Sequence, residues 1–356
     1  MNPLSLNSYN YILPKDKIAT HPLYPKENAK LLVYNRAKDS ITHATFADFA
    51  EFLPQETLII FNNTKVLPAR IYGVKVLENN QIGGKIEGLF HKTISENHYL
   101  MQFRGRLKPN SFIKFENNIY AKILKENSEG IGFKEVSFFK LESTQSFKDS
   151  ALIPLSSNEF FSFLEKFGHI PLPPYIKRSD TKEDKEDYQS VFAKHLGAIA
   201  APTASLHFSK ESFNKLIKNF STAEITLHVG AGTFLSVNEE DITKHKMHQE
   251  FFKIPPQAAS STKTAAHITA IGTTSARSVE YFLRTGQTSG YCDLFLHPKN
   301  PPQFINALLT NFHLPKTTLL MLVAAFIGLE KTLELYKIAI EKNYRFYSYG
   351  DAMLIL

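Results

Sequence analysis

Six short runs of alternating polar and apolar residues constrain the fold of this chain most strongly. They lie at 73–77, 85–90, 99–103, 112–115, 119–124 and 132–138, and turns containing Asn, Gly or Pro separate them. A period of two predicts strands, and several short strands at this spacing predict a small antiparallel barrel or sandwich. Before and after this region, buried-strand runs alternate with helical patterns, which is typical of an α/β domain.

Length and composition exclude several classes of protein. With 356 residues and 43% hydrophobic content, the chain is expected to be a soluble globular protein with two domains. The longest apolar run, 319–329, is too short to span a bilayer, and the N-terminus lacks the apolar core of a signal peptide. We therefore expect a cytoplasmic protein with no membrane partner. Cys292 is the only cysteine, which excludes disulfides, a cysteine-ligated zinc site and an iron–sulfur cluster within one chain.

The net charge of +7 favours a polyanionic partner, and nucleic acid above all. Many basic proteins bind no nucleic acid, so charge alone does not decide this point. Lysines and arginines in the turns of the alternating region could contact phosphates, and an ordinary solvated surface explains them equally well.

Polar residues follow a predicted strand at 198–201. The chain continues through a turn that contains Thr203 and reaches His207, and a helix with an apolar stripe follows from Ser209. The next predicted strand is 225–229. This order of strand, helix and strand predicts a βαβ unit.

The strand at 225–229 has one face for the core and one for chemistry. Alternation along the strand directs His228 away from the face that carries its apolar side chains. The strand stops at a turn with Gly230 and Gly232, which lacks the third glycine of a dinucleotide-binding fingerprint.

A glycine turn that opens a helix follows the predicted strand at 267–271. Its sequence is Gly272-Thr273-Thr274-Ser275-Ala276-Arg277. Such a turn presents free backbone N–H groups and the positive end of the helix dipole, and the hydroxyls and the arginine would add donors. We interpret it as an anion site, and the alternative is ordinary capping by Thr or Ser.

Three histidines lie beside turns or prolines at the ends of predicted strands: His207, His228 and His313. Strand ends are where open α/β sheets and barrels carry their catalytic groups, and histidine offers a base near neutral pH. A zinc site is the competing interpretation, but no H-x-x-x-H or H-x-H spacing occurs among these three, so we predict no metal site. Any single histidine is more often structural, so the catalytic hypothesis requires several of them to lie together.

Further turns carry polar candidates for a site. These are Asn62, Thr64 and Arg70 after a buried run, Asn311 at the end of another strand, and Tyr349 with Asp351 in an aromatic tail. The first group forms either a ligand loop or a turn whose amides bond the local backbone. Aromatic residues are more often core than ligand platform, so the tail alone indicates no function.

Several long motifs resemble the signature stretches of one family. They are FNNTKVLPARI, GHIPLPPYIKR, GAIAAPTASLHF, ITLHVGAGTF, IGTTSARSVE, LLTNFHLPKTTLLMLVAAF and YRFYSYGDAM. From about Tyr9 to Leu356, the chain resembles the S-adenosylmethionine:tRNA ribosyltransferase-isomerase family of queuosine biosynthesis, with the motifs in the family's order. Without this resemblance, composition and spacing alone indicate a two-domain α/β enzyme with an anion site and a basic surface.

The resemblance implies both a fold and a reaction. The fold would be a discontinuous, barrel-like α/β domain at 1–70 and 151–356, with a small antiparallel β-barrel domain inserted at 71–150. The enzyme would transfer and isomerise the ribosyl moiety of S-adenosylmethionine onto 7-aminomethyl-7-deazaguanine at the tRNA wobble position. The products would be epoxyqueuosine-tRNA, adenine and methionine. We expect a monomer that binds S-adenosylmethionine and the precursor tRNA and needs no cofactor, because S-adenosylmethionine is consumed as the ribosyl donor.

Residues in the matching motifs supply the expected site. We predict that His207 or His228 is the general base, with His313 or Asp351 aiding proton transfer. The residues predicted to bind substrate are Asn62, Thr64, Arg70, Thr203, Gly230, Gly232, Thr273, Thr274, Arg277, Asn311 and Tyr349. The turn at Thr273 is expected to hold either the methionine carboxylate or a tRNA phosphate. A tRNA-binding module without catalysis and a metal-dependent hydrolase are the alternative classes.

Overall fold

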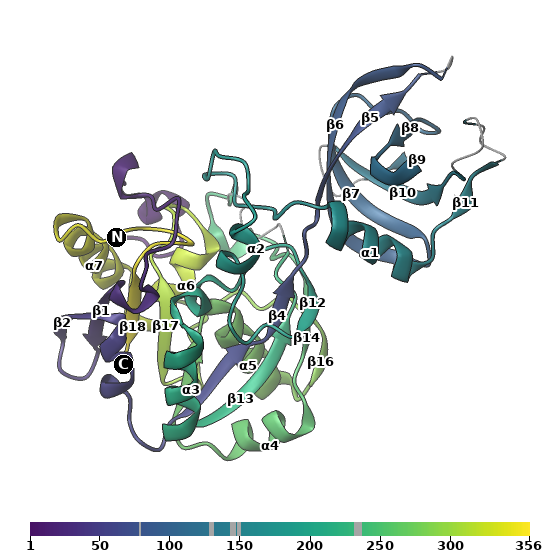
Figure 1. The fold of residues 1–356 in the computed structure, drawn as a ribbon. Helices are drawn as coiled ribbons and strands as arrows, with labels where there is room; N and C mark the ends of the chain where they lie inside the picture. The colour runs from purple at the N-terminus through teal and green to yellow at the C-terminus, as the bar shows by residue number, and fades with distance from the viewer. Residues whose placement is uncertain (78–79, 128–131, 143–146, 148–150, 231–236) are drawn as a thin grey trace. The chain divides into compact units, whose positions relative to one another are not determined.

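The chain folds into two compact units, which are described separately (Figure 1). The computed structural model describes residues 1–77, 80–127, 132–142, 147, 151–230 and 237–356. The first unit comprises Met1–Lys65, Pro174–Ile176 and Glu186–Leu356, and the second comprises Val66–Pro173 and Lys177–Lys185. The insertion expected at 71–150 lies within the second unit, which also includes the residues that flank it.

A nine-stranded mixed sheet forms the centre of the first unit. In order across the sheet, its strands are β16 (Ser289–Cys292), β14 (Glu250–Lys253), β13 (Ser221–Leu227), β3 (Leu58–Asn62), β15 (Ile268–Ile271), β17 (Ala307–Asn311), β18 (Ala352–Ile355), β1 (Lys30–Asn35) and β2 (Ser40–Thr45). The neighbours β13, β3, β15 and β17 all run parallel. β18 runs antiparallel to β17. β1 and β2 form an antiparallel hairpin, and β2 is the edge strand on this side of the sheet.

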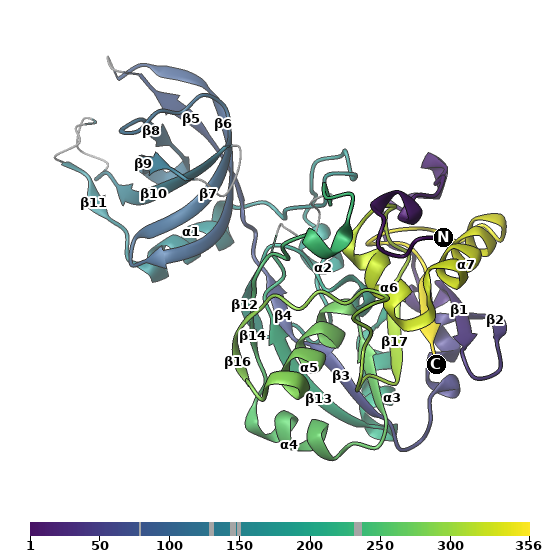
Figure 2. The ribbon, with the colours of Figure 1, turned by 180° about the vertical axis from the view of Figure 1, so that it is seen from behind.

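Helices cover both faces of this sheet (Figures 1 and 2). They are α3 (Lys210–Asn219), α4 (Pro256–Thr264), α5 (Thr273–Thr285), α6 (Thr318–Ile327) and α7 (Leu329–Glu341). Residues of α4, α5, α6 and α7 belong to one apolar core, and Leu216 of α3 belongs to the other. The central strand β3 contributes Leu58 and Ile60 to the first core and its alternate residues to the second. A strand buried on both faces must be apolar at every position, which explains the unbroken hydrophobic run in the sequence.

Short 3₁₀ helices connect these elements. They are Leu6–Tyr9, Lys15–Lys17, Lys26–Asn28, Phe46–Phe52, Glu116–Asn118, Thr203–His207 and Ile242–Lys244. The helix Thr203–His207 is part of the site described below, because it carries two of the predicted residues.

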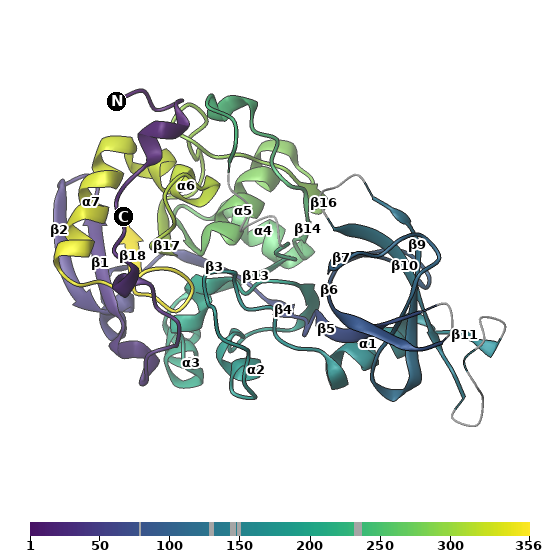
Figure 3. The same ribbon diagram turned by 90° about the horizontal axis from the view of Figure 1, so that it is seen from above.

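The second unit is a closed antiparallel barrel, whose ring can be followed in Figure 3. Its strands are β5 (Arg70–Val76), β6 (Ile82–Ser95), β7 (His98–Arg104), β8 (Phe112–Lys114), β9 (Ile119–Glu126) and β10 (Phe133–Lys140), and the short β11 (Ile153–Pro154) pairs antiparallel with β10. Pairing of β10 with both β7 and β9 closes the ring. Each of the six alternating runs in the sequence forms one strand of this ring. The predicted fold class, mixed α/β with a small antiparallel barrel, is confirmed.

Helix α1 (Ser157–Phe167) packs against the barrel through aromatic side chains. The Phe160 ring stacks on Tyr99 with 3.9 Å between centroids, and it lies 4.6 Å from the Phe138 ring. Gly168 ends the helix next to Pro68, where a Cβ atom would lie 1.9 Å from the Pro68 carbonyl oxygen. The glycine in the motif GHIPLPPYIKR is therefore required by close backbone packing.

The predicted βαβ unit around α3 is wrong. The strand before α3 is β12 (His195–Ala198), which pairs with β4 (Thr64–Val66) in a separate two-stranded sheet, whereas β13 pairs with β3. A βαβ unit needs both strands in one sheet. Helix α2 (Asp184–Asp187) is a single turn within the charged segment that follows the proline-rich stretch. In the part of the chain that the structure describes, no helix combines the length and the apolar character needed to cross a membrane.

Glu280 fixes α5 to the segment that leads into β17, and its replacement should destabilise the first unit. The side chain is fully buried, and its Oε1 accepts backbone N–H bonds from Gln303, Phe304 and Ile305 at 2.7–2.9 Å. Its Oε2 accepts a bond from Arg284 at 3.0 Å. We expect Glu280→Gln to lower the free energy of unfolding by about 3 kcal/mol, because the partly buried Arg284 loses its counter-charge at a fully buried carboxylate.

Urea denaturation of Glu280→Gln beside the exposed Glu330→Gln measures this effect. Glu330 pairs with the N-terminal ammonium at the surface and should change stability by less than about 1 kcal/mol. Equal stability of the two variants would show that Glu280 does not anchor α5.

Candidate functional site

A pocket lies at the edge of the large sheet where its parallel strands end. The carboxyl ends of β3, β13, β15 and β17 meet at this edge because the four strands are parallel neighbours, and the start of antiparallel β18 joins them. Its lining consists of Tyr175, Ala200, Ala201, Pro202, Thr203, Ala204, Val229, Gly272, Thr273, Thr274, Thr310, Asn311, His313, Leu314, Thr317, Leu319, Tyr347 and Ser348. The empty volume is about 730 Å³, including the opening to solvent. Ligands of open α/β sheets bind at such an edge.

Five residues predicted from the sequence line this pocket: Thr203, Thr273, Thr274, Asn311 and His313. The buried amide of Asn311 connects three separate segments. Its Oδ1 accepts a bond from the Thr203 hydroxyl at 3.1 Å, and its Nδ2 donates to the Tyr347 carbonyl at 3.0 Å. The same Nδ2 lies 3.3 Å from Nε2 of His207. The pocket wall is therefore held by one side chain at the end of β17.

His313 is held rigidly in the pocket wall. Its backbone N–H donates to the Tyr336 hydroxyl at 3.0 Å, and its carbonyl accepts a bond from the Tyr11 hydroxyl. Its Nε2 lies 2.8 Å from the Thr310 hydroxyl. Burial lowers the pKa of His313 to about 3, so the imidazole is neutral at neutral pH. A neutral, fixed imidazole that lines a pocket has one unprotonated ring nitrogen, which can accept a hydrogen bond from a ligand.

The first turn of α5 forms another part of the wall. Gly272 precedes the helix with φ of +87°, a conformation that favours glycine, and this directs the start of α5 toward the pocket. Asn62 at the end of β3 donates to the Thr274 hydroxyl at 3.3 Å and to the Leu227 carbonyl at 2.9 Å, and it accepts a bond from the Leu227 N–H. Asn62 thus joins β3, β13 and α5 without lining the pocket itself.

His228 lies beside this pocket rather than in its lining. Its Nδ1 is 2.8 Å from the Thr64 hydroxyl. Its ring packs on Gly197, where a Cβ atom would come within 2.7 Å of the imidazole. Burial lowers the pKa of His228, and nearby His195 lowers it further. Thr64 of β4 and Gly197 of β12 therefore both contact the His228 ring.

His207 lines a smaller, neighbouring pocket that also contains Lys26, Arg345 and Tyr349. Burial lowers the pKa of His207 to about 3, and the positive charges of Arg345 and Lys26 act in the same direction. The Phe46 ring lies 5.0 Å from the imidazole. Asn311 connects His207 with the larger pocket, so these two sites share one wall.

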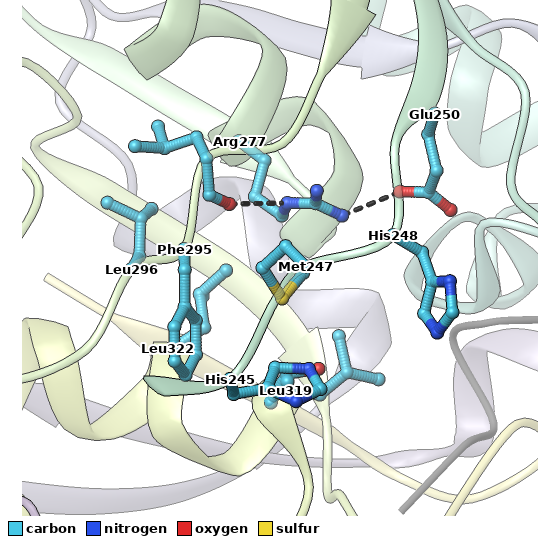
Figure 4. A pocket seen from close by; sticks show the side chains of 11 residues that line it. His245, Met247, His248, Glu250, Arg277, Phe295, Leu296, Leu319 and Leu322 are labelled. Atoms are coloured by element: carbon cyan, nitrogen blue, oxygen red, sulfur yellow. Dashed lines mark hydrogen bonds and ion pairs between the residues drawn. The ribbon is translucent and has the colours of Figure 1, made fainter. Parts of the chain in front are cut away.

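Arg277 lies in a third pocket and is neutralised by Glu250 (Figure 4). Its Nη1 is 2.6 Å from Glu250 Oε2, and its Nε donates to the Leu294 carbonyl at 3.1 Å. Both side chains are buried. The other Glu250 oxygen accepts a bond from the Gly230 N–H at 2.9 Å, which fixes the turn after β13. The structure thus separates Arg277 from Thr273 and Thr274, with which the sequence grouped it.

Asp351 supports the loop that precedes β18. Its carboxylate accepts N–H bonds from Lys30 at 3.1 Å and from Arg345 at 2.7 Å, and the side chain is 2% exposed. Tyr349 in the same loop packs edge-on against Tyr188. Asp351 therefore holds the backbone, and it does not line any of the three pockets described above.

The remaining predicted residues lie elsewhere. Arg70 belongs to the barrel unit, where it pairs with Glu87 at 3.4 Å and donates to the Leu172 carbonyl at 3.3 Å. Gly232 lies outside the described residues. In the described part of the chain, no cluster of three or more His, Cys, Asp or Glu side chains could hold a metal ion.

Sequence reasoning missed an aromatic pair in the larger pocket. Tyr175 and Tyr347 stack with 4.4 Å between ring centroids, and the Tyr175 hydroxyl bonds both the side chain and the N–H of Ser348. The only local signal was the position of Tyr175 after two prolines, because prolines fix the direction of the chain. Tyr347 has φ of +73°, an unusual conformation for tyrosine.

Comparison with known proteins agrees with this architecture. The family profile described as "Queuosine biosynthesis protein" matches residues 6–355. Relatives from Campylobacter jejuni (strain 81-176) and Helicobacter pylori (strain HPAG1) are 50% and 48% identical, over 99% and 100% of both chains, respectively. Both are named S-adenosylmethionine:tRNA ribosyltransferase-isomerase. A crystal structure of S-adenosylmethionine tRNA ribosyltransferase from Thermotoga maritima is 27% identical, with a TM-score of 0.52, and covers 98% of this chain and 100% of its own.

These similarities, over a fold with a pocket at the ends of parallel strands, identify an enzyme of the ribosyltransferase-isomerase class. The chain belongs to the queuosine biosynthesis protein family, as its sequence motifs predicted.

The buried neutral state of His207 should make the fold sensitive to acid. Its pKa is about 3 in the folded chain and about 6.5 in an unfolded one, so between these values only the unfolded chain binds the proton. Stability from this group is therefore present above pH 6.5 and falls as the pH falls below it. Lowering the pH from 7.5 to 5 should cost about 2 kcal/mol through His207 alone.

Urea denaturation of the wild type and of His207→Gln at both pH values measures this contribution. The variant should lose less stability on acidification, because it lacks the group that takes up the proton. An identical loss in both proteins would mean that His207 is protonated in the folded state.

Arg277→Met should lower the stability of the fold rather than weaken the binding of one ligand. The change leaves Glu250 buried without its partner, which should lower the free energy of unfolding by about 3–5 kcal/mol. The double variant Arg277→Met with Glu250→Gln should recover part of this loss, because it removes the unpaired charge. If the single variant keeps wild-type stability in urea but binds substrate more weakly, Arg277 is a ligand residue instead.

Proposed function

We propose that this enzyme transfers the ribosyl moiety of S-adenosylmethionine to 7-aminomethyl-7-deazaguanine at the wobble position of a tRNA and isomerises it. The product would be epoxyqueuosine-tRNA, with release of adenine and methionine. The observation that carries this proposal is the pocket at the strand ends, which contains neutral His313 in a chain whose relatives are named S-adenosylmethionine:tRNA ribosyltransferase-isomerase.

The chemical character of the pocket supports a nucleoside ligand. Hydroxyls and an amide from Thr203, Thr274 and Asn311 can bond ribose oxygens, and the stacked pair of Tyr175 and Tyr347 offers an aromatic surface for a base. The first turn of α5 presents backbone N–H groups to the same pocket, which suits the methionine carboxylate. Arg277 has no part in this arrangement, because Glu250 neutralises it.

The proposed chemistry begins with proton removal. The sulfonium of S-adenosylmethionine acidifies its 5′ C–H group, so a positioned base can start the reaction. We assign this role to His313, which lines the pocket, in preference to His207 and His228, which do not line it. The amine of the tRNA base must be neutral to attack the donor, and the departing adenine must receive a proton.

The other components of the proposal follow from the substrates. A polyanionic tRNA suits the net charge of +7. S-adenosylmethionine would be consumed as a substrate, and no further cofactor is part of the scheme. We propose that the enzyme acts as a monomer in the cytoplasm, where both substrates are present.

The direct test combines the protein with S-adenosylmethionine and precursor tRNA and measures free adenine and methionine. Both should appear in equal amounts with the modified tRNA. Release of neither product with an intact precursor tRNA would contradict the proposed reaction.

His313→Asn should lower kcat by about 100-fold or more with little change in KM, because it removes a proton acceptor and leaves the pocket in place. His228→Asn is the matched control, since His228 is buried near the same edge of the sheet but does not line the pocket. Its kcat should stay within a few-fold of the wild type. Near-normal turnover of His313→Asn would exclude His313 as the base.

A further inference from the structure

The smaller pocket, which His207 lines, contains two positively charged side chains that have no role in the proposed reaction. Its lining consists of Pro22, Leu23, Lys26, Ala29, Leu206, His207, Arg345, Ser348, Tyr349 and Gly350, and it is called the Lys26 pocket here. Lys26 and Arg345 bring two positive charges to it, and the lining contains no carboxylate.

The two cations are only partly compensated by nearby acids. Arg345 contacts Asp351 at 3.4 Å, but this carboxylate also accepts two backbone N–H bonds. Within the described part of the chain, Lys26 forms no ion pair, although Glu27 and Glu186 lie close enough to favour its charge. Burial lowers the pKa of Lys26, so its ammonium has lost much of its water without gaining a partner. An anion in the pocket would supply that partner.

The Lys26 pocket adjoins the larger one. Ser348 lines both pockets. Asn311 bonds Thr203 in the larger pocket and lies 3.3 Å from His207 in the smaller one. The two pockets therefore share a wall, so a ligand of one lies next to a ligand of the other.

Two exposed side chains precede Lys26 in the sequence. Leu23 lines the Lys26 pocket and is 36% exposed, and Tyr24 is 63% exposed, with its hydroxyl bonded to the Asp187 carboxylate. An exposed aromatic ring beside a cation is an arrangement that contacts unpaired nucleotides, with the ring against a base and the cation on a phosphate.

We propose that Lys26 and Arg345 bind an oxyanion beside the larger pocket, and that a phosphate of the tRNA strand supplies it. The site rests on the geometry of the Lys26 pocket, whereas RNA as the source rests on the proposed function. The carboxylate of S-adenosylmethionine is the other possible source of the same chemistry. The exposed Tyr24 ring, two residues before Lys26 in the sequence, favours the phosphate.

Lys26→Met tests the site by removing one charge while keeping the length of the side chain. Binding of precursor tRNA, without turnover, is measured at several salt concentrations, and KM for S-adenosylmethionine is measured separately. The tRNA Kd should rise about 10-fold, and the salt slope of log Kd should fall by about one ion, because one phosphate contact is lost. Lys26→Arg should restore both values.

Lys218→Met is the control, because it removes the same charge from an exposed position on α3. It should leave the tRNA Kd close to that of the wild type. A raised KM for S-adenosylmethionine in Lys26→Met, with unchanged tRNA binding, would support the site and identify the carboxylate as its ligand. If Lys26→Met matches Lys218→Met in both measurements, the inference is wrong.

Inorganic phosphate provides a test that does not need the proposed function. At constant ionic strength, phosphate in place of chloride should raise the Tm of the wild type and of Lys218→Met but not of Lys26→Met. An equal shift in all three proteins would contradict the site even if tRNA binds. Failure of the wild type to bind tRNA, with this phosphate difference intact, would contradict the proposed function alone.

Discussion

The parallel pairing of β3 with β13 and β15 is the constraint on which the site depends. Parallel neighbours end at the same edge of a sheet, so their carboxyl ends bring residues from distant parts of the chain together. Asn62 strengthens this edge, because its amide bonds the backbone of β13 and the first turn of α5. A buried amide that lost these partners would cost free energy, so Asn62 fixes the position of the pocket wall as well as the fold.

Burial and hydrogen bonding also explain why the polar groups of the site are fixed in position and uncharged. His313 is held by hydrogen bonds to its backbone on both sides, and the Asn311 side chain bonds two segments far away in sequence. Burial keeps the imidazoles of His313 and His207 neutral near pH 7. Two positive charges, those of Lys26 and Arg345, lie instead in the neighbouring Lys26 pocket.

The features that could be predicted from the sequence are those that depend on the pattern of neighbouring residues. The barrel strands followed from alternation, and the pocket residues Thr203, Thr273, Thr274, Asn311 and His313 followed from their positions beside turns at strand ends. The partner of Arg277 could not be predicted, because Glu250 is 27 residues away and only the tertiary fold brings it within 2.6 Å. The βαβ prediction was wrong for a related reason: pairing of β12 with β4 rather than with the large sheet is a long-range choice that local pattern does not contain.

A structure of the protein with bound S-adenosylmethionine, or with an unreactive analogue, tests the central claim most directly. We expect the nucleoside to lie in the pocket between the first turn of α5 and the end of β17, with its sulfonium-bearing 5′ carbon facing His313. A nucleoside bound in the Arg277 pocket, or on the barrel unit, would show that the substrate site is not at the ends of the parallel strands.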